Sequence, residues 1–200
     1  MIYIFRHGQT DWNLAGRVQG HKETSLNETG ITQAKTLATF FSKLKIEKLY
    51  VSPQKRAQQT ASYLGVEISS DERLKEISFG DFEGFTIKEI EEQRPDLIEQ
   101  RNKDRWNFAF KNGESMADVW RRAGSFADEK LKNKSDSEIF GVLAHGALNR
   151  VLTGYILNLA PQQILKMMQP NNVFYKIYKK QISYCKYEKY PHWYKGMLER

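Results

Sequence analysis

One sequence pattern occurs twice in this chain: an apolar run followed by a histidine and a glycine, with one arginine, Arg6, before the histidine in the first copy. It occupies residues 2–8 and again residues 139–146, so that His7 and His145 hold equivalent positions. Short apolar runs rich in β-branched residues are typical of strands buried on both faces of a parallel sheet. Since ligands of open α/β sheets bind beyond the carboxyl ends of the strands, we predict that both histidines lie at one ligand-binding edge.

Between and after these two strands, predicted strands alternate with predicted helices. Residues 49–51 and 66–68 are further short strands, and residues 172–178 and 181–187 form a hairpin that we place at the edge of the sheet. We therefore predict an α/β fold, a three-layer sandwich whose mostly parallel central sheet is covered by helices on both faces. Signals for the first turn of a helix occur at Asn27, at Ser52 with Pro53, at Thr86 with Glu89 and at Ser115 with Asp118.

The chain is predicted to form a single domain, residues 1–200, because no Pro-, Gly- or Ser-rich linker divides it. Residues 11–25 are polar and punctuated by glycine, which indicates a loop. Within residues 85–113, a short helix ends before Pro95 and the remainder is polar and aromatic without a clear period. We interpret this stretch as an excursion that covers the end of the sheet, as a lid or a specificity segment.

The composition argues against several classes of protein. No apolar run approaches the ~18 residues that a membrane span needs, and strand-like sequence from residue 2 leaves no room for a signal peptide. The single cysteine, Cys185, cannot form an internal disulfide, and no Cys/His cluster has the spacing of a metal site. We expect a cytoplasmic protein that needs no metal and no cofactor.

The formal net charge of +7 is unevenly distributed. Residues 166–200 contain eight Lys/Arg against two Glu, together with six of the ten tyrosines. Such a surface can bind a polyanion, but it is also typical of a sheet edge on which lysines prevent pairing with other strands. We favour the sheet edge and do not expect nucleic acid or a membrane as a partner. Both monomer and homodimer remain open.

Cationic and imidazole side chains accompany the carboxyl ends of three predicted strands: Arg6 and His7 follow the first, Arg56 the second and His145 the last. Each has a simple alternative, namely a surface pair, a helix-surface arginine and a core histidine. Together they predict a pocket with two guanidinium groups and two imidazoles, which needs an anionic guest because like charges repel. A phosphoryl group suits these donors, with His7 beside it as a candidate nucleophile.

Five motifs follow one another along the chain: Arg6-His7-Gly8-Gln9-Thr10, then Asn13, then Ser52-Pro53 with Lys55-Arg56-Ala57, then the segment from Glu76 to Gly84, then Ala144-His145-Gly146. In order and spacing they resemble the histidine phosphatase superfamily, and within it the phosphoglycerate-mutase-like branch. The resemblance extends from residue 1 to about residue 150. It implies a phosphatase of the broad-specificity type that acts on a small phosphorylated substrate.

The resemblance implies a mechanism that the chemistry of the residues supports. His7 would attack phosphorus through one ring nitrogen to form a phosphohistidine, while a backbone carbonyl holds the proton on the other nitrogen. Arg6, Arg56 and His145 would bind the phosphoryl oxygens and supply the positive charge that a metal ion supplies in other enzymes. The site is therefore expected to work without a metal.

Two carboxylates compete for the role of general acid and base. The family pattern favours Glu76, whereas Glu83 occupies a second acidic position from which it could bind substrate or only cap a loop. The resemblance also implies contacts to the phosphate or the substrate from four further residues, for which an ordinary loop role is the alternative: Asn13, Gln19, Gly20 and Gly146.

Hydrolysis of a phosphomonoester is the activity that we expect. The glycolytic mutases of the family carry a longer insertion and a longer tail, whereas only 28 residues separate Gly84 from Gly113 here. A more open site admits water to the phosphohistidine, which favours hydrolysis over transfer to a second hydroxyl group. The alternatives are a cofactor-dependent phosphoglycerate mutase and a non-catalytic polyanion-binding protein on the same fold.

Overall fold

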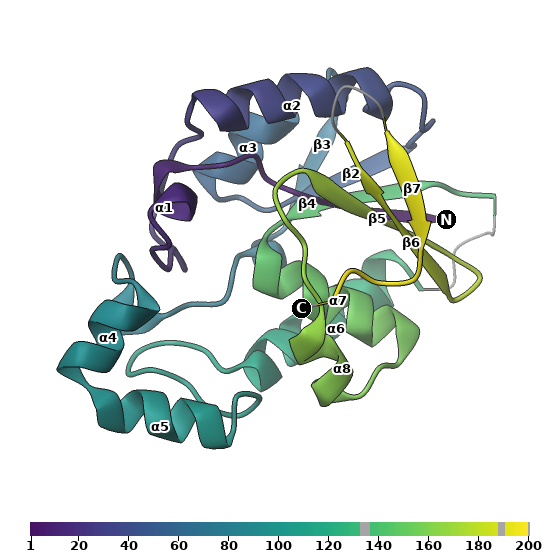
Figure 1. The fold of residues 1–200 in the computed structure, drawn as a ribbon. Coiled ribbons are helices and arrows are strands. Elements are labelled where there is room, and N and C mark those ends of the chain that lie inside the picture. The colour runs from purple at the N-terminus through teal and green to yellow at the C-terminus, as the bar shows by residue number, and fades with distance from the viewer. Residues whose placement is uncertain (133–136, 188–190, 200) are drawn as a thin grey trace.

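A seven-stranded sheet forms the centre of the computed structural model, which describes residues 1–132, 137–187 and 191–199 (Figure 1). Its strands are β1 Ile2–Arg6, β2 Lys48–Val51, β3 Ile68–Ser70, β4 Phe140–Ala144, β5 Val173–Tyr178, β6 Gln181–Lys186 and β7 His192–Lys195. They lie in the order β3-β2-β4-β1-β5-β6-β7, in which the first four strands are parallel and β5 to β7 join them as antiparallel neighbours. The predicted α/β fold with a parallel centre is confirmed.

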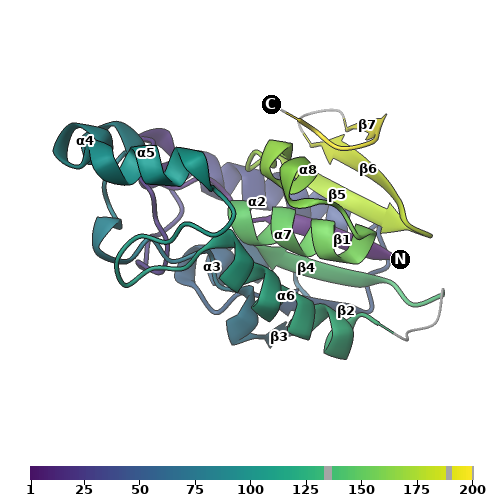
Figure 2. The ribbon, with the colours of Figure 1, turned by 90° about the horizontal axis from the view of Figure 1, so that it is seen from below.

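Helices cover both faces of the sheet, as predicted (Figures 1 and 2). On one face lie α2 Glu28–Phe41 and α3 Lys55–Ser62, and on the other lie α6 Met116–Lys130 and α7 Gly146–Leu157. Because side chains alternate along a strand, β1 sends Tyr3 and Phe5 into one core and Ile4 into the other. Complete burial of a side chain such as Ile4 stabilises the fold by about 1.5–3 kcal/mol.

The carboxyl ends of three parallel strands lie side by side, because β2, β4 and β1 are neighbours in the sheet. Arg6 at the end of β1 pairs with Ala144 at the end of β4, and Val51 of β2 pairs with Leu143. The residues that follow these strands therefore begin at one edge, as the repeated motif predicted.

Residues 85–113 contain two helices, α4 (Ile87–Gln93) and α5 (Pro95–Lys103), which lie apart from the sheet beyond its carboxyl edge (Figure 1). Pro95 follows the end of α4, as predicted, but it also occupies the first turn of α5. Proline is favoured there because the N–H that it lacks would have no hydrogen-bond acceptor within the helix. These helices pack on a small apolar cluster of their own, formed by Ile90, Ile98 and Phe110.

Three of the four predicted helix starts are confirmed, because the side chains of Asn27, Thr86 and Ser115 each accept a hydrogen bond from the first turn. The fourth is wrong: Ser52 does not cap α3, which begins three residues later. The hydroxyl oxygen of Ser52 accepts the N–H of Gln54 at 3.4 Å, before the helix begins, and is also hydrogen-bonded to His145.

Three further details differ from the sequence prediction. The predicted loop at residues 11–25 contains the single-turn helix α1 (Asp11–Leu14), which Thr10 caps. The third strand begins at residue 68 rather than 66, and helix α8 (Pro161–Lys166) was not predicted. Each of these elements is short, and short elements depend more on tertiary contacts than on periodicity.

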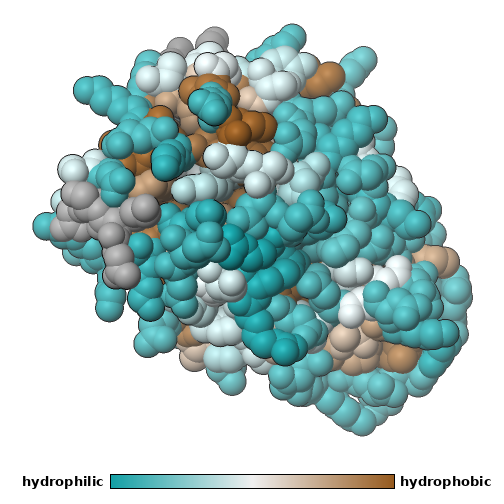
Figure 3. Space-filling view, turned by 180° about the vertical axis from the view of Figure 1, so that it is seen from behind, coloured by the Kyte–Doolittle hydropathy of each residue, from teal (hydrophilic) through white to brown (hydrophobic). Residues whose placement is uncertain are grey.

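The C-terminal hairpin of β5 and β6 is confirmed as antiparallel, but its place at the sheet edge is wrong. β7 pairs with β6 and forms the edge, with all four of its residues exposed. Residues 188–190 and 200 of the predicted basic segment lie outside the described residues. In the described ranges no helix is long and apolar enough to cross a membrane, and the surface seen in Figure 3 is mostly hydrophilic.

Candidate active site

His7 follows β1 directly and is only 2% exposed, so the alternative of a surface pair is wrong. Its backbone N–H donates to the carbonyl oxygen of Ala144 at 3.0 Å, which ties it to the end of β4. Its Nδ1 lies 2.7 Å from the carbonyl oxygen of Gly8. Since a carbonyl can only accept, the proton is on Nδ1, and Nε2 carries the free lone pair. This is the hydrogen bond that the sequence analysis predicted.

Gly8 is required by packing rather than by the ligand. A Cβ atom at Gly8 would lie 2.4 Å from the carbonyl oxygen of Gly30 in α2, which is closer than real Cβ contacts. The N–H of Gly8 donates to the hydroxyl group of Thr60 at 3.0 Å. Helices α2 and α3 thus fix the backbone that holds the Nδ1 proton of His7.

His145 follows β4 and is completely buried. Its ring centroid lies 5.1 Å from that of His7, and its Nε2 lies 2.8 Å from the hydroxyl oxygen of Ser52. Its Nδ1 is buried and has no hydrogen-bond partner among the described residues. His145 is therefore not a satisfied core histidine, because one of its two ring nitrogens is free to bind a ligand.

Two arginines flank the imidazoles, and each is held by backbone carbonyl groups. The buried Arg56 donates to the carbonyl oxygens of Lys22 and Gly20 at 2.9 and 3.0 Å, and Arg6 donates to that of Gln169 at 2.6 Å. The Nε atoms of both arginines are buried without a partner among the described residues. Complete burial also rules out the helix-surface role considered for Arg56.

In the part of the chain that the structure describes, these side chains thus leave three buried nitrogen atoms without a partner: Nε of Arg6, Nε of Arg56 and Nδ1 of His145. A buried polar group without a hydrogen bond costs roughly 1–3 kcal/mol. A tetrahedral oxyanion offers several acceptors and a negative charge, so a phosphoryl group would satisfy these donors together.

The electrostatics keep the imidazoles neutral. Burial, followed by the positive charges of Arg6 and Arg56, holds the pKa of His7 well below its usual value, and burial and Arg56 do the same for His145. Burial also lowers the pKa of Arg56 to about 10, at which the guanidinium remains charged near neutral pH. A neutral His7 keeps its Nε2 lone pair for nucleophilic attack.

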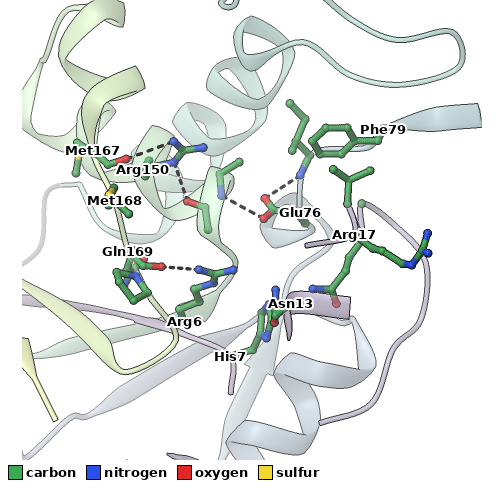
Figure 4. A pocket seen from close by; sticks show the side chains of 17 residues that line it. Arg6, His7, Asn13, Arg17, Glu76, Phe79, Arg150, Met167, Met168 and Gln169 are labelled. Carbon is green, nitrogen blue, oxygen red and sulfur yellow. Dashed lines mark hydrogen bonds between the residues drawn. The ribbon is translucent and has the colours of Figure 1, made fainter. Parts of the chain in front are cut away.

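Glu76 faces Arg6 and His7 across the pocket (Figure 4). Its carboxylate accepts hydrogen bonds from the backbone N–H groups of Ile77, Ala147 and Leu148 at 3.0–3.1 Å. Two of these donors belong to the first turn of α7, whose positive end favours a carboxylate. The carboxylate is thus fixed at the end of the same strand–helix unit that carries His145.

Glu83 does not line this pocket. Its Oε1 accepts hydrogen bonds from the backbone N–H groups of His21 and Phe79 at 2.8 and 3.2 Å, and from the hydroxyl group of Ser78. A Cβ atom at Gly20, which has φ +50°, would lie 2.0 Å from this oxygen. The contacts of Glu83 are those of a residue that joins two loops.

The other predicted contact residues line the pocket. The amide oxygens of Asn13 and Gln19 accept hydrogen bonds from Thr10, which places their NH₂ groups on the opposite side of each amide. A Cβ atom at Gly146 would lie 3.3 Å from Cζ of Arg6, so the glycine lets this guanidinium pass close to the first turn of α7.

The pocket has a volume of about 410 Å³, and several residues in its lining were not predicted. Arg150 lies four positions after Gly146, which is about one turn along α7. This spacing could have predicted from the sequence that Arg150 lines the pocket. Gln169 contacts Arg6 through its backbone, for which the sequence holds no signal. The remaining unpredicted residues of the lining are Arg17, Val18, Ile77, Phe79, Ala147, Met167 and Met168. Among the described residues, no three His, Cys, Asp or Glu gather as a metal site would require.

Known proteins resemble this chain in sequence. Phosphoserine phosphatase 1 of Hydrogenobacter thermophilus is 27% identical over 192 residues, with 88% of this chain and 90% of the relative aligned. Human 6-phosphofructo-2-kinase/fructose-2,6-bisphosphatase 4 is 32% identical over 178 residues, but this chain spans only 37% of its length.

Solved structures resemble the chain over nearly its whole length. Mycobacterial hydrolase 1 matches with a TM-score of 0.80 and 26% identity, covering 100% of this chain and 97% of that structure. A mycobacterial glucosyl-3-phosphoglycerate phosphatase in complex with VO3 matches with a TM-score of 0.77 and 26% identity, covering 99% and 98%. Residues 2–181 match the family description of the histidine phosphatase superfamily (branch 1), and the chain belongs to this superfamily.

Proposed function

We propose that this protein is a phosphomonoesterase that transfers the phosphoryl group of a small metabolite to Nε2 of His7 and then to water, without a metal ion. One observation carries the proposal: a buried, neutral imidazole with its proton held on Nδ1 lies beside three buried nitrogens that have no partner among the described residues. A nucleophile and a set of oxyanion donors in contact are what phosphoryl transfer requires.

In the first step a bond forms between Nε2 of His7 and phosphorus while the bond from phosphorus to the ester oxygen breaks. Arg6, Arg56 and His145 donate hydrogen bonds to the phosphoryl oxygens, on which charge is spread in a loose transition state. Glu76 gives a proton to the departing oxygen, so the leaving group departs as a neutral alcohol. The product of this step is the phosphohistidine.

In the second step Glu76, now a carboxylate, accepts a proton from a water molecule that attacks phosphorus. The bond from phosphorus to Nε2 breaks, inorganic phosphate leaves, and Glu76 is again protonated for the next cycle. Two guanidinium groups supply the positive charge in both steps, which is the role that divalent cations take in metal-dependent phosphatases.

Hydrolysis is favoured over the mutase alternative by the names of the relatives that align over nearly their whole length. One is named a phosphoserine phosphatase and another a glucosyl-3-phosphoglycerate phosphatase. The substrates in these two names have different leaving groups. The relatives therefore support the type of reaction but do not identify the metabolite. We propose that residues 85–113, with α4 and α5 at the carboxyl edge, act as the specificity segment of a single domain.

The third alternative, a polyanion-binding surface, is not favoured by the C-terminal strands. Lys176 stacks over the ring of Trp193 at 4.9 Å and Lys186 over that of Tyr194 at 5.8 Å, so these cations contact aromatic neighbours in the sheet. The buried free Cys185 agrees with a reducing compartment such as the cytoplasm.

A steady-state screen tests the proposal. Purified protein is incubated with a panel of phosphomonoesters in the presence of a chelator, and released phosphate is measured. We expect hydrolysis of an aryl phosphate and of at least one alkyl phosphate. Activity that disappears with the chelator and returns only with a divalent cation would overturn the proposed mechanism.

A further inference from the structure

The segment that carries Glu76 needs support from outside, because residues 75–79 have no regular secondary structure. They connect two short 3₁₀ turns, Glu72–Leu74 and Gly80–Phe82. No sheet ladder or helix therefore holds this backbone. The position of the Glu76 carboxylate depends on side chains that reach the segment from other elements.

Arg122 of α6 is the main one of these side chains. A guanidinium has five N–H donors, and the contacts of Arg122 account for all five. Three go to backbone carbonyl oxygens, those of Arg73, Lys75 and Glu76, at 2.7, 2.6 and 3.0 Å. The other two go to the carboxylate of Glu114, at 2.9 and 3.0 Å. The side chain is only 18% exposed, so solvent competes little with these bonds.

Glu114 holds the backbone on the other side of Glu76. Its Oε2 accepts a hydrogen bond from the backbone N–H of Ser78 at 3.0 Å, and its own N–H donates to the carbonyl oxygen of Ser78 at 2.9 Å. Arg122 and Glu114 together therefore hold the chain before, at and after Glu76. The carboxylate that this backbone carries then reaches the first turn of α7.

We propose that Arg122 is a positioning residue for the proton donor: it acts on leaving-group protonation through Glu76 and has no part in binding the phosphoryl group. This inference rests on the proposed function of Glu76. All five N–H groups of Arg122 have protein acceptors, whereas Nε of Arg6 and Nε of Arg56 have none among the described residues. Loss of Arg122 should therefore impair the proton transfer and leave the oxyanion donors in place.

The test compares an alkyl phosphate, whose leaving group needs a proton, with 4-nitrophenyl phosphate, whose leaving group does not. The variants are Arg122→Gln and the milder Arg122→Lys. Lysine keeps the charge but lacks the planar guanidinium that donates to the backbone carbonyls and to Glu114 at once. Arg121→Gln is the matched control, because Arg121 is the next residue on α6, is 77% exposed and pairs with Asp118.

We expect Arg122→Gln to lower kcat for the alkyl phosphate on the order of ten- to a hundredfold, since small displacements of a catalytic group are costly. For the aryl phosphate the loss should be less than about threefold, because little protonation is needed. Arg122→Lys should fall between Arg122→Gln and wild type on the alkyl substrate. Arg121→Gln should match wild type on both.

A double-mutant cycle with Glu76→Gln separates positioning from general structural damage. If Arg122 acts through Glu76, Arg122→Gln adds little to the loss already caused by Glu76→Gln on the alkyl phosphate. Hydrogen exchange of peptides that contain Ile77 and Ala147 should also speed up in Arg122→Gln and remain unchanged in Arg121→Gln.

Equal losses on the two substrates, or losses that add fully in the cycle, would overturn the positioning role and leave the proposed function intact. Wild-type protein that hydrolyses neither substrate would overturn the proposed function itself, and the positioning role with it.

Discussion

The hydroxyl oxygen of Ser52 lies 2.8 Å from Nε2 of His145, and this contact joins the ends of two neighbouring parallel strands. For Nδ1 of His145 to donate to a phosphoryl oxygen, Nε2 must accept the proton of the Ser52 hydroxyl group. The Ser52 hydroxyl group can donate this proton, so the contact is compatible with the tautomer of His145 that the proposed mechanism needs.

Ser52→Ala should weaken the binding of the transition state. The variant removes the hydroxyl group that can donate to Nε2 of His145 and leaves this buried nitrogen without that partner, which costs roughly 1–3 kcal/mol. We expect kcat/KM for an aryl phosphate to fall on the order of tenfold or more. Gln58→Ala is a suitable control, because Gln58 donates to the backbone carbonyl oxygen of Ser52 rather than to its hydroxyl group. Wild-type kcat/KM in Ser52→Ala would show that the hydroxyl group does not orient His145.

Glu76→Gln should slow alkyl phosphates far more than aryl phosphates. Removing the proton donor is expected to cost a factor on the order of 10² to 10⁴ when the leaving group is an alkoxide. Glu83→Gln is the comparison, because its carboxylate joins the loops at His21 and Phe79 without lining the pocket. A larger alkyl-selective loss in Glu83→Gln than in Glu76→Gln would transfer the role to Glu83.

Stability should decrease on mild acidification. Burial and the charges of Arg6 and Arg56 hold the pKa values of His7 and His145 well below the ordinary 6.5. As the pH falls below about 6.5, the unfolded chain binds protons at these histidines before the folded chain does, so the free energy of unfolding decreases.

Urea unfolding in phosphate-free buffer at about pH 7.5 and about pH 5.5 measures this effect. We expect His7→Gln to lose less stability than wild type between the two values. His192→Gln, on the exposed strand β7, should behave as wild type. An identical pH dependence in wild type and His7→Gln would argue against a buried neutral His7.

The sequence predicted those parts of the site that lie within a few residues of a strand end. His7, Arg56 and His145 could be grouped because parallel neighbouring strands end at one edge, and strand patterns are readable from apolar runs. The choice of Glu76 came from the family resemblance, since its segment has no periodicity of its own.

The remaining contacts could not be predicted, because they join residues that only the fold brings together. Gln169 holds Arg6 through a backbone carbonyl that lies 163 positions away, and any residue type carries such a group. Arg122 holds the backbone before Glu76 in the same way. The contact between Ser52 and His145 is of the same kind, since it joins residues that lie 93 positions apart.

The most direct test of the central claim is to trap the phosphohistidine. Wild-type protein is mixed with a phosphomonoester labelled in its phosphoryl group and quenched in alkali. We expect label that is stable in alkali, labile in acid and located on His7. His7→Ala should abolish it, and His145→Ala should slow its appearance by weakening the transition state. Water alone should then release inorganic phosphate at the rate of normal turnover. Hydrolysis that proceeds without label on His7, or that survives in His7→Ala, would contradict the account. Label that persists in water and leaves only when a phosphoglycerate acceptor is added would identify a mutase instead.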